Sequence, residues 1–108
     1  LDVTQQVLMQ ADEVRRQFTA PILRPVLDFA EIWFEQFFPS ITFHDPLAAA
    51  TVFKPELCEY ASGQVAIDRV EKPGRTIFAP GGYQPPHQIA GTVNVREYFD
   101  HFFEIVGR

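Results

Sequence analysis

The chain has 108 residues, of which 46% are hydrophobic and 21% charged, as in one packed globular segment. A net charge of −5 and a pI near 5.0 argue against a nucleic-acid-binding protein. No cluster of Lys and Arg predicts binding to an acidic membrane, and Glu, Gln, Pro or Asp interrupts every long apolar stretch. Eleven Phe residues need a large core or a partner surface that covers them.

The N-terminal sequence and the cysteine content bear on the cellular location. The one cysteine, Cys58, excludes an internal disulfide and is compatible with a reducing compartment. The opening "LDVTQQV" lacks the positive region and apolar run of a signal peptide. We therefore expect a cytoplasmic protein. Because the chain begins without Met and inside an expected element, we also expect that residue 1 is not a natural start.

The first half of the chain predicts a short strand and two helices. Residues 1–4 have the character of a strand end, and residues 10–18 predict a helix of about two turns with Asp12 as its N-cap. Residues 22–38 carry apolar side chains at a period near 3.6, which predicts a largely buried helix that Pro39 ends. Residues 39–43 are expected to be a connector.

The second half predicts a helix, three strands and a final helix. We expect a helix over residues 45–53 with Asp45 at its N-cap and Pro46 at its first position. Residues 63–71 and 75–79 predict a hairpin, and residues 89–95 a third strand after a loop rich in Pro and Gly. Asn94 is expected to cap a helix over residues 95–106. The content is therefore mixed α and β, with more apolar face than these elements can cover.

The stretch "FHDPLAAA", residues 43–50, allows two interpretations. In one, Asp45 only caps a helix and His44 is an ordinary surface residue, which is the commoner case for such a pattern. In the other, the Asp45 carboxylate offers an oxygen to a hard cation such as calcium, and His44 donates a proton near neutral pH. The three residues alone leave both interpretations open.

Five stretches in the same order resemble the inosine–uridine-preferring nucleoside hydrolases, over all 108 residues. "FHDPLAAA" with "FKPEL" is similar to the family's histidine–aspartate–proline segment, and "LDVTQQVL" to its L-D-V-T-H stretch. "ILRPVLDFAEIWF" resembles the helix that precedes the histidine. "VAIDRVEKPGRTIF" resembles the family's strand pair, and "TVNVREYFDHFFEIV" its C-terminal helix.

The resemblance implies hydrolysis of the N-glycosidic bond of ribonucleosides to ribose and a free base, as in purine and pyrimidine salvage. The implied fold is α/β: the C-terminal portion of a Rossmann-like nucleoside hydrolase fold, with several helices and a few strands. Residues 1–108 would form a single segment of that domain. Asp45 matches a calcium ligand, His44 matches the proton donor to the leaving base, and Gln36 lies where the family places leaving-group contacts.

Several family motifs are not found in this chain. The aspartate-rich D-T-D-x-G-x-D-D opening, the G-P-L-T-N stretch and the E-F-N region are absent, and Gln5 stands where the family often has His. Because calcium takes six to eight oxygen ligands, Asp45 cannot hold it alone. We therefore expect the isolated chain to be inactive, with a missing N-terminal portion or with partner copies in a homo-oligomer. The alternative is a non-catalytic interaction or oligomerisation domain.

Overall fold

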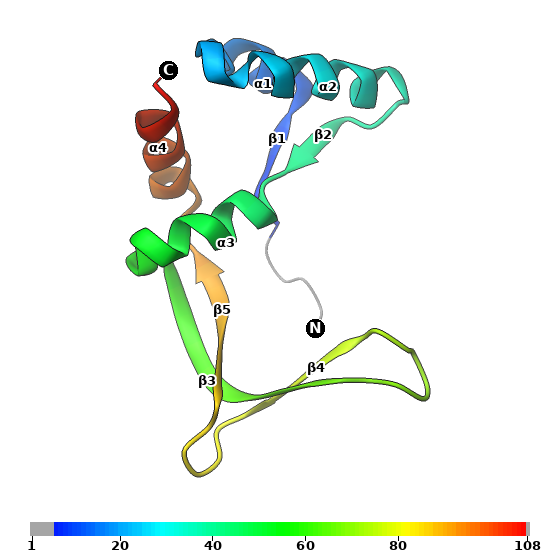
Figure 1. The fold of residues 1–108 in the computed structure, drawn as a ribbon, viewed down its shortest axis with the longest axis vertical. Coiled ribbons are helices and arrows are strands. Elements are labelled where there is room, and N and C mark those ends of the chain that lie inside the picture. The colour runs from blue at the N-terminus through cyan, green and yellow to red at the C-terminus, as the bar shows by residue number, and fades with distance from the viewer. Residues whose placement is uncertain (1–5, 108) are drawn as a thin grey trace.

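The computed structural model describes residues 6–107, in which helices and short strands are mixed (Figure 1). The helices are α1 (Ala11–Gln17), α2 (Arg24–Glu35), α3 (His44–Phe53) and α4 (Val95–Val106), with short 3-10 helices η1 (Pro21–Leu23) and η2 (Pro55–Leu57). The strands are β1 (Leu8–Gln10), β2 (Ser40–Thr42), β3 (Cys58–Ile67), β4 (Thr76–Pro80) and β5 (His87–Val93). The predicted mixed α and β content is confirmed. The strand expected over residues 1–4 lies outside the described residues, and so does Gln5.

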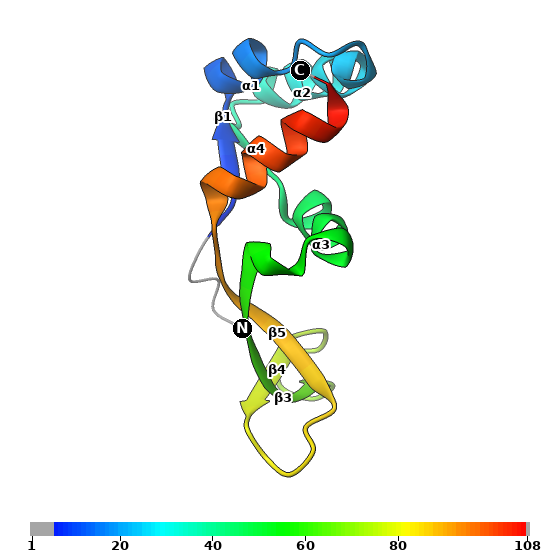
Figure 2. The ribbon, with the colours of Figure 1, turned by 90° about the vertical axis from the view of Figure 1, so that its left-hand side faces the viewer.

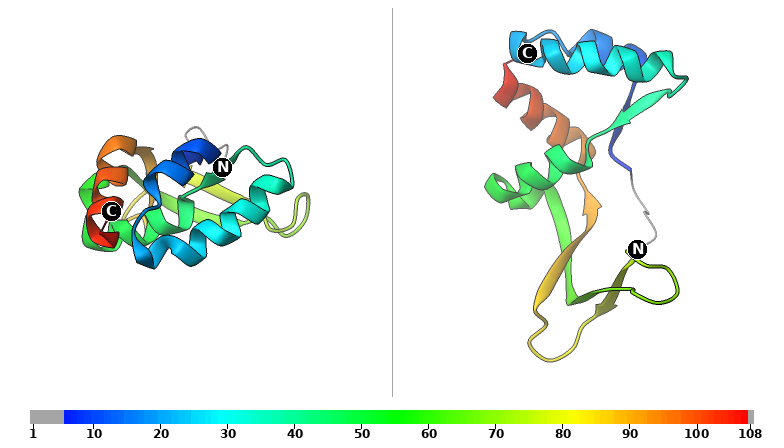
Figure 3. Two further views of the ribbon diagram at one scale, coloured as in Figure 1. Left: turned by 90° about the horizontal axis from the view of Figure 1, so that it is seen from above. Right: turned by 45° about the vertical axis from the view of Figure 1, so that its right-hand side comes forward.

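The strands form two small antiparallel sheets. β1 pairs with β2, with Leu8 opposite Thr42, and the second sheet has the order β4-β3-β5. The three-stranded sheet extends away from the helices, at the lower end of the molecule in Figure 1 and in the right view of Figure 3. α4 lies between the α1–α2 pair and α3 (Figures 1 and 2). The molecule is consequently elongated, with extents of 47 × 32 × 19 Å.

The helix bounds differ from the prediction at several ends. The helix expected over residues 22–38 is η1 followed by α2, which ends at Glu35. Asp12 does not cap α1: Gln10 precedes the helix, and Asp12 lies in the first turn, where its charge favours the positive end of the helix dipole. The Asn94 cap of α4 is confirmed, because its side chain accepts a hydrogen bond from the Glu97 N–H.

No helix in residues 6–107 has the length and apolar character needed to cross a bilayer.

The core lies where α1, α3 and α4 meet. The Phe43 ring contacts Phe18, after α1, edge-on at 6.1 Å between centroids, and contacts Phe99 of α4 at 5.1 Å. Tyr98 and Phe103 of α4 are almost completely buried in the same cluster. Since Phe43 directly follows β2, this aromatic packing fixes where the chain turns from β2 into α3. Phe43 also donates its backbone N–H to the Val7 carbonyl at 2.8 Å.

Strand β3 is the central strand of the second sheet, and a turn connects it to β4. β3 begins at Cys58, earlier than expected, and pairs with β5 along its first half and with β4 along its second. Asp68 organises the turn that follows, because its carboxylate accepts backbone N–H bonds from Val70 and Lys72 at 2.9 and 3.1 Å. Gly63 lies against the Phe78 ring and the Ala79 carbonyl, so the two strands approach closely there.

Candidate functional site

The start of α3 places His44 and Asp45 side by side on the surface. The first hydrogen bond of the helix joins the Leu47 N–H to the Phe43 carbonyl at 2.9 Å, so Phe43 is the N-cap residue. The prediction that Asp45 caps this helix is therefore wrong, and Pro46 is not its first residue. The buried Phe43 ring sets the N-cap and the first residue of α3 two positions earlier than the sequence pattern predicted. Both His44 and Asp45 are exposed in the first turn.

The imidazole of His44 is oriented by the main chain before β1. The Val7 N–H donates to His44 Nε2 at 3.4 Å, a long hydrogen bond. A nitrogen that accepts carries no proton, so the proton of the neutral ring is on Nδ1. His44 therefore offers an N–H donor from Nδ1, while Nε2 holds the ring against the Val7 backbone.

The carboxylate of Asp45 is available to a cation. Within residues 6–107, neither a hydrogen bond nor an ion pair engages the Asp45 side chain, which is exposed to solvent. Its oxygens are hard ligands of the kind that calcium prefers. The same part of the chain contains no group of three or more His, Cys, Asp or Glu side chains that could hold a metal ion. Asp45 thus fits calcium as one ligand, and the remaining oxygens would come from outside the described residues.

Gln36 is not in contact with the other two candidates. It is the residue that ends α2, where its N–H donates to the Trp33 carbonyl at 3.2 Å, and its side chain is exposed. Pro39 and strand β2 separate it from α3 along the chain. Among the described contacts, none joins Gln36 to His44 or Asp45. The structure therefore brings together His44 and Asp45 and leaves Gln36 at a different helix end.

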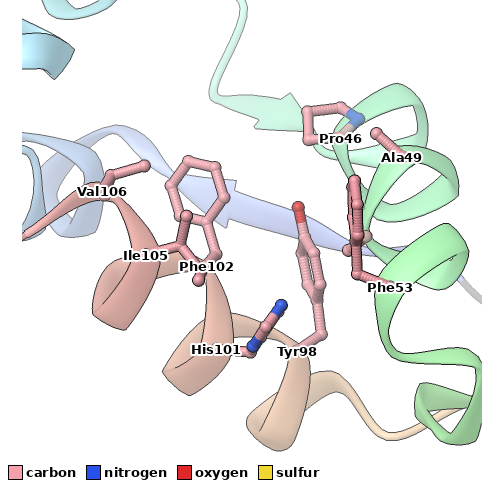
Figure 4. Close-up of a pocket in the computed structure, with 9 residues that line it drawn as sticks. Pro46, Ala49, Phe53, Tyr98, His101, Phe102, Ile105 and Val106 are labelled. Atoms are coloured by element: carbon pink, nitrogen blue, oxygen red, sulfur yellow. The ribbon is translucent and has the colours of Figure 1, made fainter.

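An apolar groove begins beside this pair, at Pro46. We call it the α3–α4 groove; it has a volume of about 580 Å³, and Figure 4 shows its two walls. Its walls are Pro46, Ala49, Ala50 and Phe53 of α3, and Tyr98, His101, Phe102, Ile105 and Val106 of α4. The Tyr98 side chain lies between Phe102 and Phe53 (Figure 4). Its hydroxyl is buried without a hydrogen-bond partner among the described residues, and burial raises the pKa of Tyr98 to about 12.

No sequence pattern predicted the α3–α4 groove. The spacing of Tyr98, Phe102 and Ile105 in α4 indicates an apolar face, but it does not tell which helix lies opposite. His101, which follows the polar pattern, forms part of the groove wall. Only the tertiary packing of α4 on α3 assembles these residues.

Comparison with known proteins gives no relative from which residue roles could be taken. No protein-family model matches the chain, and searches of curated proteins and of solved structures returned no similar chain.

Proposed function

We propose that this chain is the C-terminal part of a ribonucleoside hydrolase, which splits the N-glycosidic bond and releases ribose and a free base. The observation that carries this proposal is the exposed His44–Asp45 pair in the first turn of α3, within the stretch that resembles the nucleoside hydrolases. The same resemblance supports a Rossmann-like α/β fold for the complete domain. A cytoplasmic location is proposed separately, because the one cysteine, Cys58, is compatible with a reducing compartment. The described strands supply only two small antiparallel sheets, so the main sheet would come from upstream sequence.

Asp45 is proposed to hold calcium together with carboxylates from an upstream aspartate-rich motif. When bound, calcium makes a coordinated water more acidic and neutralises nearby negative charge. Asp45 contributes one carboxylate in a fixed position, because the first turn of α3 and the buried Phe43 before it anchor its backbone. Its lack of other polar partners among residues 6–107 leaves both oxygens for this task.

His44 is proposed to protonate the departing base. The base leaves with the electron pair of the glycosidic bond, so a proton donated to it lowers the barrier. Transfer of a proton from a neutral ring would leave an imidazolate, so His44 must be protonated on both nitrogens when it acts as the acid. The long contact from the Val7 N–H to Nε2 requires an unprotonated nitrogen, so it orients the ring in the neutral state.

Gln36 is proposed as a contact for the leaving base. Because it lies at the end of α2, this role requires that the base extends from His44 toward that helix end. Its exposed amide provides both a donor and an acceptor, which suits the edges of purines and pyrimidines.

The test uses the parent protein, including its upstream aspartate-rich motif, with inosine and uridine as substrates. We expect ribose release that stops when calcium is removed. Asp45→Asn should raise the calcium concentration required for half-maximal activity. His44→Ala should lower inosine hydrolysis about 100-fold, the smaller end of the range for a lost general acid. Asp12→Asn is the matched control, since Asp12 is also an exposed carboxylate in a first helical turn.

Two outcomes would overturn the proposal. One is a parent protein that has no aspartate-rich motif and releases no ribose. The other is ribose release that Asp45→Asn and Asp12→Asn affect equally.

The alternative, a non-catalytic interaction domain, is favoured by the exposed apolar side chains of α2 and α3. Phe29 and Phe53 project into solvent, although large aromatic side chains are usually covered. In that case Asp45→Asn would change neither calcium binding nor any hydrolysis. The exposed apolar side chains of α2 and α3 would then bind a partner protein, whether or not the chain takes part in catalysis.

A further inference from the structure

The hydroxyl of Tyr98 is a polar group in an apolar part of the molecule. The Tyr98 side chain is completely buried, and its oxygen has no hydrogen-bond partner among residues 6–107. The other aromatic rings of α4 belong to Phe99, Phe102 and Phe103. A buried hydroxyl without a partner lowers stability, so ring packing alone would favour Phe at position 98 as well. The hydroxyl is therefore explained best by a partner that is not part of the described residues.

This hydroxyl is directed into the α3–α4 groove. Figure 4 shows the Tyr98 ring ending in the space between Phe102 of α4 and the α3 residues Pro46 and Phe53. Neighbouring side chains shield the oxygen from solvent. Phe53 is 85% exposed, so its ring has room to turn aside when a molecule enters the groove. A bound molecule can thus bring a hydrogen-bond acceptor to an oxygen that solvent does not reach.

The dimensions of the groove suit a small molecule better than a protein. Its volume of about 580 Å³ lies within the range of roughly 300–1,000 Å³ that is usual for ligand pockets. Nine residues line it, whereas a standard protein interface uses about 20–30 residues on each side. The apolar side chains on both walls can cover most of such a ligand, which leaves the Tyr98 hydroxyl to orient it.

The charges around the groove select an uncharged ligand. No Lys, Arg, Asp or Glu side chain is among the lining residues. Lys54, directly after α3, is in an ion pair with Glu97 at 2.9 Å and so is not free to bind an anion. A charged group taken into the groove would lose its hydration without gaining a counter-charge. Because burial raises the pKa of Tyr98 to about 12, its hydroxyl keeps its proton at neutral pH and acts as a donor.

We propose that the α3–α4 groove binds an uncharged, mainly apolar small molecule that offers one hydrogen-bond acceptor, such as a ketone oxygen, to the Tyr98 hydroxyl. Apolar walls that bury the body of a ligand and a single polar group that orients it are the usual components of such pockets. This binding does not depend on the proposed hydrolase activity, since neither His44 nor Asp45 lines the groove.

The test compares benzophenone with diphenylmethane, which has the same two rings but no carbonyl. Each is titrated into the 108-residue chain, and the backbone amides are followed by NMR. We expect saturable shifts in α3 and α4, with benzophenone bound about 5-fold more tightly, the effect of one neutral hydrogen bond. The anion 4-benzoylbenzoate should bind more weakly than benzophenone.

Variants of the chain test the role of the hydroxyl directly. Tyr98→Phe should weaken benzophenone binding about 5-fold or more and leave diphenylmethane binding unchanged, because only the ketone loses a partner. Tyr83→Phe is the matched control, since Tyr83 is exposed in the β4–β5 loop and is not part of the groove. Ala49→Trp fills the groove from an exposed position of α3 and should abolish binding of both compounds. Thermal melts check that each variant is folded.

Three results would overturn the proposed binding site. The first is a Tyr98→Phe variant that binds both compounds as the native chain does, or that weakens both equally. The second is a set of shifts around exposed side chains of α2, such as Phe29, instead of in α3 and α4. The third is binding by this chain but not by its parent protein, which would mean that upstream sequence covers the groove. None of these measurements involves ribose release, so the proposed function is tested independently.

Discussion

The ammonium group of Lys54 contacts Glu97 Oε1 at 2.9 Å and so joins the end of α3 to the first turn of α4. Glu97 is itself held by Asn94, whose side chain accepts from the Glu97 N–H at 3.1 Å and donates to Glu97 Oε2 at 3.2 Å. This small network joins the residue after the α3 wall of the groove to the first turn of the helix that forms the α4 wall. It therefore contributes to the relative position of the two helices.

Lys54→Met should lower the melting temperature slightly, and the loss should shrink in high salt because the pair is partly exposed. The hydrogen bond with Glu97 raises the pKa of Lys54. A raised pKa means that this contribution is complete below the unfolded pKa of lysine and disappears as pH rises through the folded value. Thermal melts of Lys54→Met at low and high salt measure this loss of melting temperature, with Lys72→Met as control. An equal loss at both salt concentrations would contradict an ionic contribution.

Tyr98→Phe should stabilise the fold by about 1 kcal/mol, because it removes a buried hydroxyl that has no partner among residues 6–107. The ring packing on Phe43 and Phe99 is kept. Urea unfolding of both proteins measures the difference, and Tyr83→Phe, whose side chain is exposed, serves as control. A clear loss of stability would show that the hydroxyl has a polar partner after all.

The same variant should alter the alkaline stability of the protein. Burial raises the pKa of Tyr98 to about 12 from 10.0, so the unfolded chain releases this proton first as pH rises. The native chain therefore keeps its full free energy of unfolding below pH 10 and loses about 3 kcal/mol of it between pH 10 and 12 through Tyr98. The advantage of Tyr98→Phe over the native chain should therefore grow above pH 10. A constant difference between pH 8 and 11.5 would contradict this.

Asp68→Asn should loosen the turn between β3 and β4. The backbone N–H of Val70, followed by that of Lys72, lowers the pKa of Asp68, and Arg75 contributes through its side chain. The stabilisation is therefore present above the unfolded pKa of 3.8 and is lost as pH falls through the lower folded value. The Val70 and Lys72 amides should be less protected from hydrogen exchange in Asp68→Asn than in the native chain at neutral pH, and this difference in protection should disappear in acid. Asp28→Asn on α2 should leave these amides unchanged.

Phe37→Asn should stabilise the chain by about 1 kcal/mol, the cost of holding a bulky residue in the left-handed region. Phe37 has φ of 68° directly after α2, and its side chain is 96% exposed, so little packing is lost. Asparagine tolerates this conformation. Tyr83→Asn is the control, because Tyr83 is also an exposed aromatic residue but does not have positive φ. Equal changes in the two variants would point to lost apolar exposure instead of relieved strain.

Gly63→Ala should separate β3 from β4. A Cβ at this position would lie 2.6 Å from the Phe78 ring and would also overlap the Ala79 carbonyl, so backbone has to move. We expect a loss of roughly 1–3 kcal/mol or more. Gly91→Ala is a matched control in the same sheet, since its Cβ would lie 3.8 Å from the Glu59 carbonyl, an ordinary contact. Similar melting temperatures for the two variants would contradict the close approach.

Local patterns predicted most of the helices and the β3–β4 hairpin, but not the starts of all these elements. The apolar period of residues 22–38 located α2, and the Asn94 cap was confirmed because its hydrogen bond spans only three residues. The Asp45 cap was wrong because the start of α3 depends on Phe43, whose ring is placed by residues far along the chain. β2 was missed for a similar reason: its three residues form a strand only by pairing with β1.

The candidate site was predictable only as far as it is local. His44 and Asp45 are neighbours in sequence, so their proximity needed no fold. The Val7 hydrogen bond to His44 joins residues 37 positions apart, and no periodicity indicates such a contact. The α3–α4 groove likewise requires two helices that the β3–β5 sheet separates in sequence.

The close approach at Gly63 also has an evolutionary consequence. A relative that keeps this strand pairing must keep glycine at position 63 whatever residue stands at position 78, because a Cβ there would meet the backbone carbonyl of residue 79 as well as the Phe78 ring. Loss of this glycine should therefore mark relatives in which β3 and β4 no longer pair as they do here.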